Sequence, residues 1–426
     1  MRQPKGVPYS RQQYFMLLTL LALAGFAALF VRQGMMARGA SSKSDQLSQR
    51  QVQVDGGNYL YYALKQASGY VLARAAKGSD GQPLGVPQSV AQFGNAFGQQ
   101  ESDAILFMQL SPDGRYLAID GTQDHGEQVW IFNIQQRMLT LTPANVMGNF
   151  LHWLPGVSEP AFLYRPMFPL GPDAPQDSTG WNPGLWVVNA ATGAITNINI
   201  HMPSAFLVDA APSPDGSRIV YSTSEGLGMG SDSWMMNSDG SHMAHLFTMP
   251  GGARSIAGMF AWSPDGTKIA YERLSDSPTP FLPAGLWLMN PNGMQQRYLA
   301  DTDGGHGFAL SWSPDSHRIA YVVRTNIGDR SANFSAQSLQ SAIAVVDISA
   351  AHSWIVASQA QTSKQISDNP VWTDNGNKLT FTAYNPFNIV LGGSPRYWSV
   401  QATNQRSQSQ VTPLTSLLLH VVAIGS

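Results

Sequence analysis

Apolar residues are distributed along this chain in two different ways. Residues 14–31 form one continuous apolar run, YFMLLTLLALAGFAALFV, which lies between Arg11 and Arg32. Further along, short apolar segments alternate with polar residues and are separated by Pro, Asp, Asn and Gly. The long run predicts a membrane-spanning helix, and the alternation between turn residues predicts β-strands.

The apolar run predicts an uncleaved single-pass anchor over residues 14–32. A spanning helix needs about 20 apolar residues, whereas the apolar core of a cleaved signal peptide, which is the alternative, has about 7–15. Residues 1–13 are then a short tail, and residues 33–55, rich in Gln and Ser, a flexible stalk. Basic residues flank both ends of this helix almost equally, so they do not decide its orientation. A large C-terminal part behind a short basic N-terminus is usually translocated, and this decides the predicted orientation. We expect residues 56–426 on the extracytoplasmic side of a cell membrane.

A ten-residue motif recurs after the stalk. Its clearest copy, WSPDGTKIAY, occupies residues 262–271. Other copies, some of them weaker, lie at residues 110–119, 153–164, 212–221, 312–321 and 372–381. In each copy an apolar strand ends at the Trp position, Pro-Asp-Gly makes a tight turn, and a second strand follows. A third strand, in most repeats carrying another Trp, and a fourth strand complete the unit.

Four antiparallel strands repeated every 40–60 residues are typical of a β-propeller blade. Six units carry the turn motif. Residues 59–63 and 70–73 look like second and third strands without a first, and residues 417–424 look like a first strand without a second. Joining them gives a closed ring of seven blades, with a six-bladed ring as the alternative. The predicted fold class is therefore all-β, a propeller of four-stranded antiparallel blades behind one transmembrane helix.

The tandem Trp-Ser-Pro-Asp-Gly-x-x-Ile-Ala-Tyr units resemble the TolB-type, WD-like propeller repeat family over about residues 56–426. On function this resemblance implies protein-binding modules, sugar-processing enzymes or the propeller halves of peptidases. The chain departs from the peptidase arrangement because no room remains for a following hydrolase domain. It also departs from the periplasmic TolB arrangement, because it has no separate N-terminal α/β domain.

Charge and composition narrow the possible partners and chemistry. Residues 1–50 carry seven of the 25 basic residues and one of the 27 acidic ones, so residues 51–426 have a net charge of −8. A domain of this sign repels nucleic-acid phosphates, and we expect no nucleic-acid partner. The chain has no Cys, which excludes disulfides, thiol nucleophiles and Cys-ligated metals.

The sequence contains no recognisable catalytic motif. It has no Gly-x-Ser-x-Gly elbow, phosphate-binding loop, dinucleotide fingerprint or His-Glu-x-x-His. His242-x-x-His245 has no visible third metal ligand, and residues 301–306 start like a calcium loop but lack its later carboxylates. The repeated Asp residues are interpreted as turn formers; they are Asp113, Asp215, Asp265 and Asp315. The repeated Trp residues are interpreted as packing between blades. We therefore predict no catalytic residue, no metal and no cofactor.

The connections between second and third strands are long in several repeats and predict a binding face. They cover residues 165–184, 272–285, 322–341 and 383–395. Because strands alternate in direction, all four leave the same face of the ring. They carry aromatic residues that a solvent loop does not require: Phe168, Trp181, Phe281, Phe334 and Phe387. Insertions collected on one face usually mark the functional face, although these aromatics could instead cap the blade edges.

The predicted function is that of a membrane-anchored, extracytoplasmic, non-enzymatic scaffold that binds a protein or a cell-envelope polymer. One alternative is a sugar lyase or hydrolase with its site in the central channel, which requires converging ionisable groups. The other is a ligand-sensing ectodomain that works with a separate signalling protein.

Overall fold

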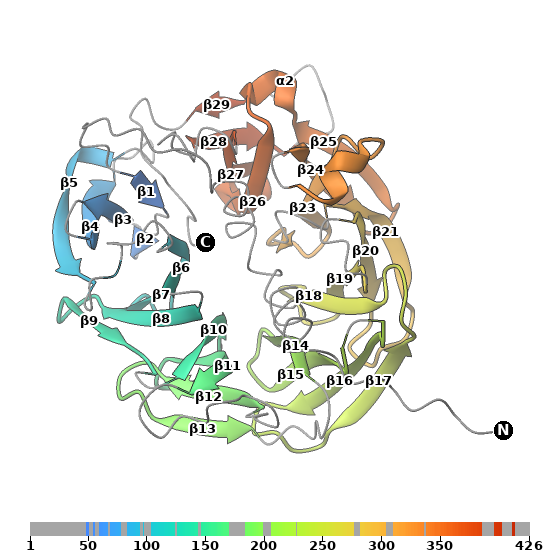
Figure 1. Ribbon diagram of the computed structural model, residues 1–426, viewed down its shortest axis with the longest axis horizontal. Helices are drawn as coiled ribbons and strands as arrows, with labels where there is room; N and C mark the ends of the chain where they lie inside the picture. Colours follow the sequence, from blue (N-terminus) through green and yellow to red (C-terminus); the bar gives the residue numbers. More distant parts are fainter. Residues whose placement is uncertain are drawn as a thin grey trace.

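The computed structural model describes residues 48–413 with gaps. The gaps are residues 51–53, 56–58, 67–68, 78–82, 94–96, 98–103, 124–125, 144–145, 170–183, 199–205, 227, 277–281, 304–309, 336–337, 386–395 and 403–410. Within these residues, seven antiparallel sheets are arranged as blades around a central axis (Figure 1). The predicted all-β, seven-bladed propeller is confirmed.

The first four blades follow the chain in order. Blade 1 contains β1 (Ser48–Arg50), β2 (Val54–Asp55), β3 (Tyr59–Gln66), β4 (Gly69–Lys77) and β5 (Pro83–Gln92). Blade 2 contains β6 (Ala104–Leu110), β7 (Tyr116–Gln123), β8 (Gly126–Asn133) and β9 (Met138–Leu141). Blade 3 contains β10 (Val146–Trp153), β11 (Ala161–Pro169), β12 (Leu185–Asn189) and β13 (Ile195–Ile198). Blade 4 contains β14 (Phe206–Pro212), β15 (Arg218–Ser224), β16 (Ser231–Asn237) and β17 (Ala244–Met249).

The remaining three blades close the circle next to blade 1 (Figure 1). Blade 5 contains β18 (Ile256–Trp262), β19 (Ile269–Leu274), β20 (Ala284–Met289) and β21 (Arg297–Thr302). Blade 6 contains β22 (Ser311–Trp312), β23 (Arg318–Arg324), β24 (Ser341–Asp347) and β25 (His352–Ala357). Blade 7 contains β26 (Ile366–Thr373), β27 (Lys378–Tyr384), β28 (Arg396–Gln401) and β29 (Thr412–Pro413). Short helical turns lie at η2 (Arg330–Asn333), α2 (Gln359–Thr362) and η4 (Asp374–Gly376).

From blade 1 to blade 7 along the chain, each blade is held to the following one by apolar side chains between their sheets. Between blades 6 and 7, for example, Ile343 and Val345 of β24 share one buried cluster with Trp372 and Phe381 of blade 7. The first strand of each blade lies nearest the axis and the fourth lies at the rim (Figure 1). The core is therefore a ring of inter-blade layers, which is how a sheet that is apolar on both faces buries its side chains.

The inner strand of blade 1 differs from the prediction. β1 and β2 pair antiparallel with β3, through Ser48 with Lys65 and Val54 with Leu60. The inner position is thus filled by residues that were expected to form part of the stalk. Residues 417–424, expected to supply this strand, lie outside the described residues.

No helix in the described part of the chain is long and apolar enough to cross a membrane. The predicted anchor, residues 14–32, lies outside the described residues.

Candidate binding face

The two faces of the ring carry different connections. The Ser-Pro-Asp-Gly turns join first to second strands on one face, which we call the turn face. Because strands alternate in direction, the connections between second and third strands leave the opposite face. We call this the connection face; its described residues include 225–226, 228–230, 275–276, 282–283, 325–335 and 338–340.

Neighbouring connections of blades 4 and 5 are joined to each other. The buried carboxylate of Asp276, in blade 5, accepts the backbone N–H of Gly228 (2.7 Å) and of Gly230 (2.6 Å), in blade 4. Gly230 has a φ of +79°, and a Cβ there would lie 1.9 Å from the carbonyl oxygen of Met249, so only glycine fits. Met229 lies between these two fixed glycines with 56% of its surface exposed.

The connection of blade 6 is also held in one conformation. The Asn326 side chain donates to the carbonyl of Ser338 (2.7 Å) and accepts the N–H of Gln340 (3.0 Å), which closes the base of the loop. Asp329 caps η2 by accepting the N–H of Ser331 (2.9 Å).

A small apolar core beneath this loop consists of Ala332, Leu339 and Ile366. Phe334, at the end of η2, does not join that core and is 66% exposed. Ile327 in the same loop is 55% exposed. The loop therefore presents two large apolar side chains to solvent on a fixed backbone.

The structure places two of the five predicted face aromatics. Phe334 lies exposed on the connection face, and Phe168 lies in β11 opposite Met147 of β10. Trp181, Phe281 and Phe387 lie outside the described residues. The sequence interpretation missed Met229 and Ile327 because it considered aromatics only. Their signal is an apolar residue beside glycine within a connection, as in Gly228-Met229-Gly230 and Ile327-Gly328.

A cluster of charged groups lies between blades 2, 3 and 4. Asp120 of β7 and Glu127 of β8 are each only 1% exposed. Arg165 of β11 donates from Nε and Nη2 to the Asn149 amide oxygen (3.0 and 2.8 Å). Its Nη1 donates to the carbonyl of Val208 in blade 4 (2.8 Å). These groups lie on second and third strands, whereas an enzyme site in the central channel would need ionisable groups on the inner strands.

The electrostatics of this cluster favour retained protons. Burial raises the pKa of Glu127 to about 7, although the charge of Arg165 acts in the opposite direction. Burial, and then the charge of Glu127, raise the pKa of Asp120 well above its ordinary value. A carboxyl that titrates near neutral pH can exchange protons in a reaction or serve as a switch.

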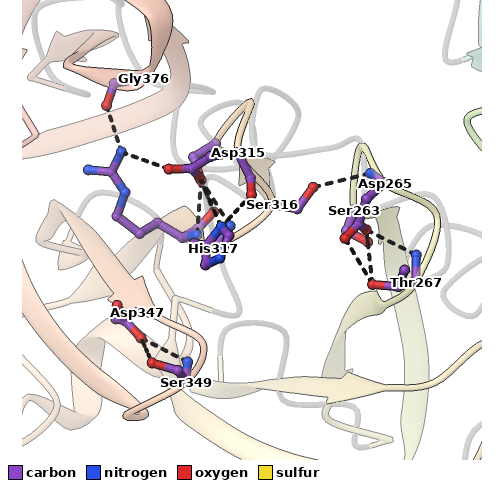
Figure 2. A network of polar contacts seen from close by, with 11 residues as sticks. Ser263, Asp265, Thr267, Asp315, Ser316, His317, Asp347, Ser349 and Gly376 are labelled. Atoms are coloured by element: carbon purple, nitrogen blue, oxygen red, sulfur yellow. Dashed lines mark hydrogen bonds and ion pairs between the residues drawn. The ribbon is translucent and has the colours of Figure 1, made fainter.

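The repeated Asp residues are turn formers, as predicted. The Ser213 hydroxyl and the Ser217 N–H both donate to Asp215, and these bonds lower the pKa of Asp215 to about 2. Figure 2 shows the same arrangement around Asp265, whose N–H also donates to the Ser316 hydroxyl of the next turn (3.1 Å). These carboxylates are therefore occupied within their own turns, and the backbone N–H of Asp265 links one turn to the next.

The residues examined for metal binding are engaged elsewhere. His242 contacts Asn237 (2.9 Å), whereas His245 contacts Asp232 (3.2 Å). Asp301 pairs with Arg254 at 2.7 Å. No group of three or more His, Asp or Glu side chains that could hold a metal ion occurs among the described residues.

Comparisons with known proteins identify the fold. No family model and no curated protein matches the sequence. An oligogalacturonate lyase in complex with manganese superposes with a TM-score of 0.53 at 15% identity, covering 84% of this chain and 91% of that one. An oligogalacturonate lyase from Vibrio parahaemolyticus gives 0.53 at 15%, with 85% and 93% covered. A structure from a study of two prolyl endopeptidases gives a TM-score of 0.54 at 10% identity. This match covers 96% of the present chain and 54% of the endopeptidase chain.

TolB from Acinetobacter baumannii is a more distant match, with a TM-score of 0.42 at 15% identity over 70% of this chain and 63% of that one. At such identities only the fold is shared, so neither an enzymatic nor a binding function follows from these similarities alone. What they establish is that this chain has the propeller fold seen in the lyase structures.

Proposed function

We propose that this chain is a membrane-anchored, extracytoplasmic, non-enzymatic scaffold of TolB-type, WD-like repeats. It binds a protein or a cell-envelope polymer on its connection face. The observation that carries this proposal is the exposure of Met229, Ile327 and Phe334 on connections whose backbones are fixed by hydrogen bonds. Apolar side chains held outward on a rigid backbone lose little conformational entropy on binding and can serve as anchors for a partner.

The position of the first strand supports a partner near the membrane. Ser48 pairs with Lys65 close to the β3–β4 connection, so the chain enters the ring from the connection face. Residues 33–47, between the proposed anchor and β1, reach at most about 50 Å when fully extended. The connection face therefore stays within about that distance of the bilayer.

Site-specific photo-crosslinking tests this proposal in the full chain, in the membranes of its own source. Met229, Ile327 and Phe334 are replaced, one at a time, by p-benzoylphenylalanine. We expect each variant to form the same discrete adduct with a protein or polymer. The matched control is Met294, which is 67% exposed but lies in the β20–β21 turn on the turn face. Adducts of equal yield at Met294, or none at the three positions, would refute the proposed face.

A second candidate function is that of an enzyme, and the buried Glu127 favours it. Its raised pKa and the neighbouring guanidinium of Arg165 are features of acid–base sites that act on anionic substrates. The manganese named for one lyase structure does not fit the described residues, which contain no set of three metal-binding side chains.

An assay separates the two candidates. Oligogalacturonate is incubated with the full-length protein and with Glu127→Gln, and unsaturated sugar ends are followed by ultraviolet absorbance. A scaffold gives no product with either protein. Product formation that is lost in Glu127→Gln would establish the enzyme instead.

A further inference from the structure

The joint between blades 4 and 5 connects buried groups of the two blades through serine hydroxyls. Ser222 of β15 donates its hydroxyl to the carbonyl of Ala257 (2.6 Å). Ser231 of β16 donates to the carbonyl of Ser255 (3.0 Å) and accepts the N–H of Ala257 (2.9 Å). Two uncharged serine hydroxyls of blade 4 thus bind the backbone of Ser255 and Ala257, at the start of β18.

The joint between blades 2 and 3 has two carboxyls at the corresponding positions. Asp120 follows the last residue of its ten-residue motif as Ser222 does, and Glu127 precedes the third-strand Trp by three residues as Ser231 does. One oxygen of Asp120 accepts the N–H of Phe150 in β10 (3.0 Å). The other oxygen of Asp120 and both oxygens of Glu127 have no hydrogen-bond donor among the described residues.

The surrounding charges do not neutralise these carboxyls by direct contact. Arg165 directs its guanidinium to Asn149 and to the carbonyl of Val208, and no ion pair joins it to a carboxylate within the described part of the chain. Tyr164 donates its hydroxyl to the carbonyl of Val146 (2.7 Å).

Two further titratable groups lie beyond Arg165. Asp209 of β14 accepts the N–H of Phe260 in blade 5 (2.8 Å), and its charge acts on both Arg165 and His152 of β10. Neither group donates a hydrogen bond to Asp120 or Glu127. Three of the four oxygens of these two buried carboxyls have no donor among the described residues, so the pair cannot both ionise without a large cost in free energy.

We propose that the pair of carboxyls formed by Asp120 and Glu127 retains at least one proton when blades 2 and 3 are joined. The contact between these two blades therefore depends on protonation. Acidification strengthens the joint, and ionisation of both carboxyls loosens it. Ser222 and Ser231, at the corresponding positions between blades 4 and 5, carry no group that ionises in this way. This inference concerns the ring itself and stands apart from the proposed binding face.

The sign of the effect follows from the difference between the joined and the separated state. An exposed Glu has a pKa of about 4.3, whereas burial raises the pKa of Glu127 to about 7. Between these two values the joined state holds a proton that the separated state releases. The joined state therefore loses stability as the pH rises through this window, by up to about tenfold in the opening equilibrium per pH unit.

Hydrogen exchange of the full-length protein tests the proposal at two amides. The N–H of Phe150 reports the carboxyl joint and the N–H of Ala257 reports the serine joint. After correction for intrinsic exchange, we expect opening at Phe150 to increase between pH 5 and pH 7, by up to about tenfold per unit, and opening at Ala257 to stay level.

Two variants of equal charge change complete the experiment. Glu127→Gln should flatten the pH dependence at Phe150. Glu225→Gln, at an exposed side chain of blade 4, should leave it unchanged. If Glu127→Gln does not fold, Asp120→Asn retains an acceptor for the Phe150 N–H and gives the same readout. Equal pH dependence at both amides, or an unaltered slope in the variant, would overturn the proposal.

Discussion

At the residue scale, the repeated Trp of the first strand ties four of the blades to the blade before them. Its indole N–H donates to a backbone carbonyl of the neighbouring inner strand. The pairs are Trp153 with Gln109, Trp262 with Ala211, Trp312 with Ala261 and Trp372 with Ser311, at 2.7–3.2 Å. In the preceding blade, the acceptor always lies one residue before the position that corresponds to this Trp. The predicted packing role of these Trp residues is confirmed, and the hydrogen bond explains why an indole in particular recurs.

Replacing one of these indoles should cost more than replacing an equally buried Trp that has no hydrogen bond. Trp262 and Trp398 are both 8% exposed, but the indole N–H of Trp398 has no acceptor among the described residues. Trp262→Phe leaves the carbonyl of Ala211 without its donor. We expect it to lower the free energy of unfolding by about 1–3 kcal/mol more than Trp398→Phe. Urea unfolding of both variants measures this difference, and equal losses would argue against the hydrogen bond.

At the scale of elements, strand order follows from local chemistry wherever the turn motif is present. Pro-Asp-Gly has the same geometry in any context, because its Asp accepts local hydrogen bonds and Gly216, Gly266 and their equivalents adopt positive φ. The inner strand of blade 1 has no such signal. Residues 48–55 are mostly polar, and their only apolar residues, Val52 and Val54, make too short an alternation to predict a strand. β1 and β2 form because the edge of β3 offers them hydrogen-bond partners.

The blade 6 connection should depend on Asn326 for its fixed conformation. Asn326→Ala removes both side-chain hydrogen bonds across the base of the loop, but it leaves the strands and the backbone hydrogen bond from Thr325 to Gln340 intact. We expect faster trypsin cleavage after the exposed Arg330, with little change in the melting temperature of the ring. Asn292→Ala, which loses one hydrogen bond in a turn on the other face, is the control. An unchanged cleavage rate would show that the loop is fixed by other contacts.

At the scale of the whole molecule, the ring depends on a segment that the sequence analysis assigned to the stalk. β1 and β2 make five residue pairs with β3, counting three for β1 and two for β2. Without them β3 becomes an exposed inner edge next to β6 of blade 2. A propeller is stable because few of its strand edges remain unpaired, so this loss should affect the entire ring.

Removing residues 1–56 should therefore lower the free energy of unfolding by about 3 kcal/mol or more, at roughly 0.5–1.5 kcal/mol for each lost hydrogen bond. Removing residues 1–43, which leaves both strands in place, serves as the control. Calorimetry of the two truncated proteins gives the comparison. Equal melting temperatures would mean that the ring does not need β1 and β2.

The candidate face was only partly accessible to sequence reasoning. Alternating strand direction predicts which connections share a face, and Phe334 was identified in this way. Its exposure, and that of Met229 and Ile327, depends on whether a side chain finds a place in the core beneath its loop. Asp120, Glu127 and Arg165 carry no local motif, and only the packing of three blades brings their charges together.

By itself, the sequence determined the all-β class and the repeated blade, because tight turns and strand alternation are set by residues close together in the chain, and it left the choice between seven and six blades open. The tertiary structure decided which strand completes blade 1, which apolar side chains remain exposed, and where charges are buried. Those outcomes depend on contacts between distant segments, and the free energy of such contacts cannot be assigned to any short stretch of sequence.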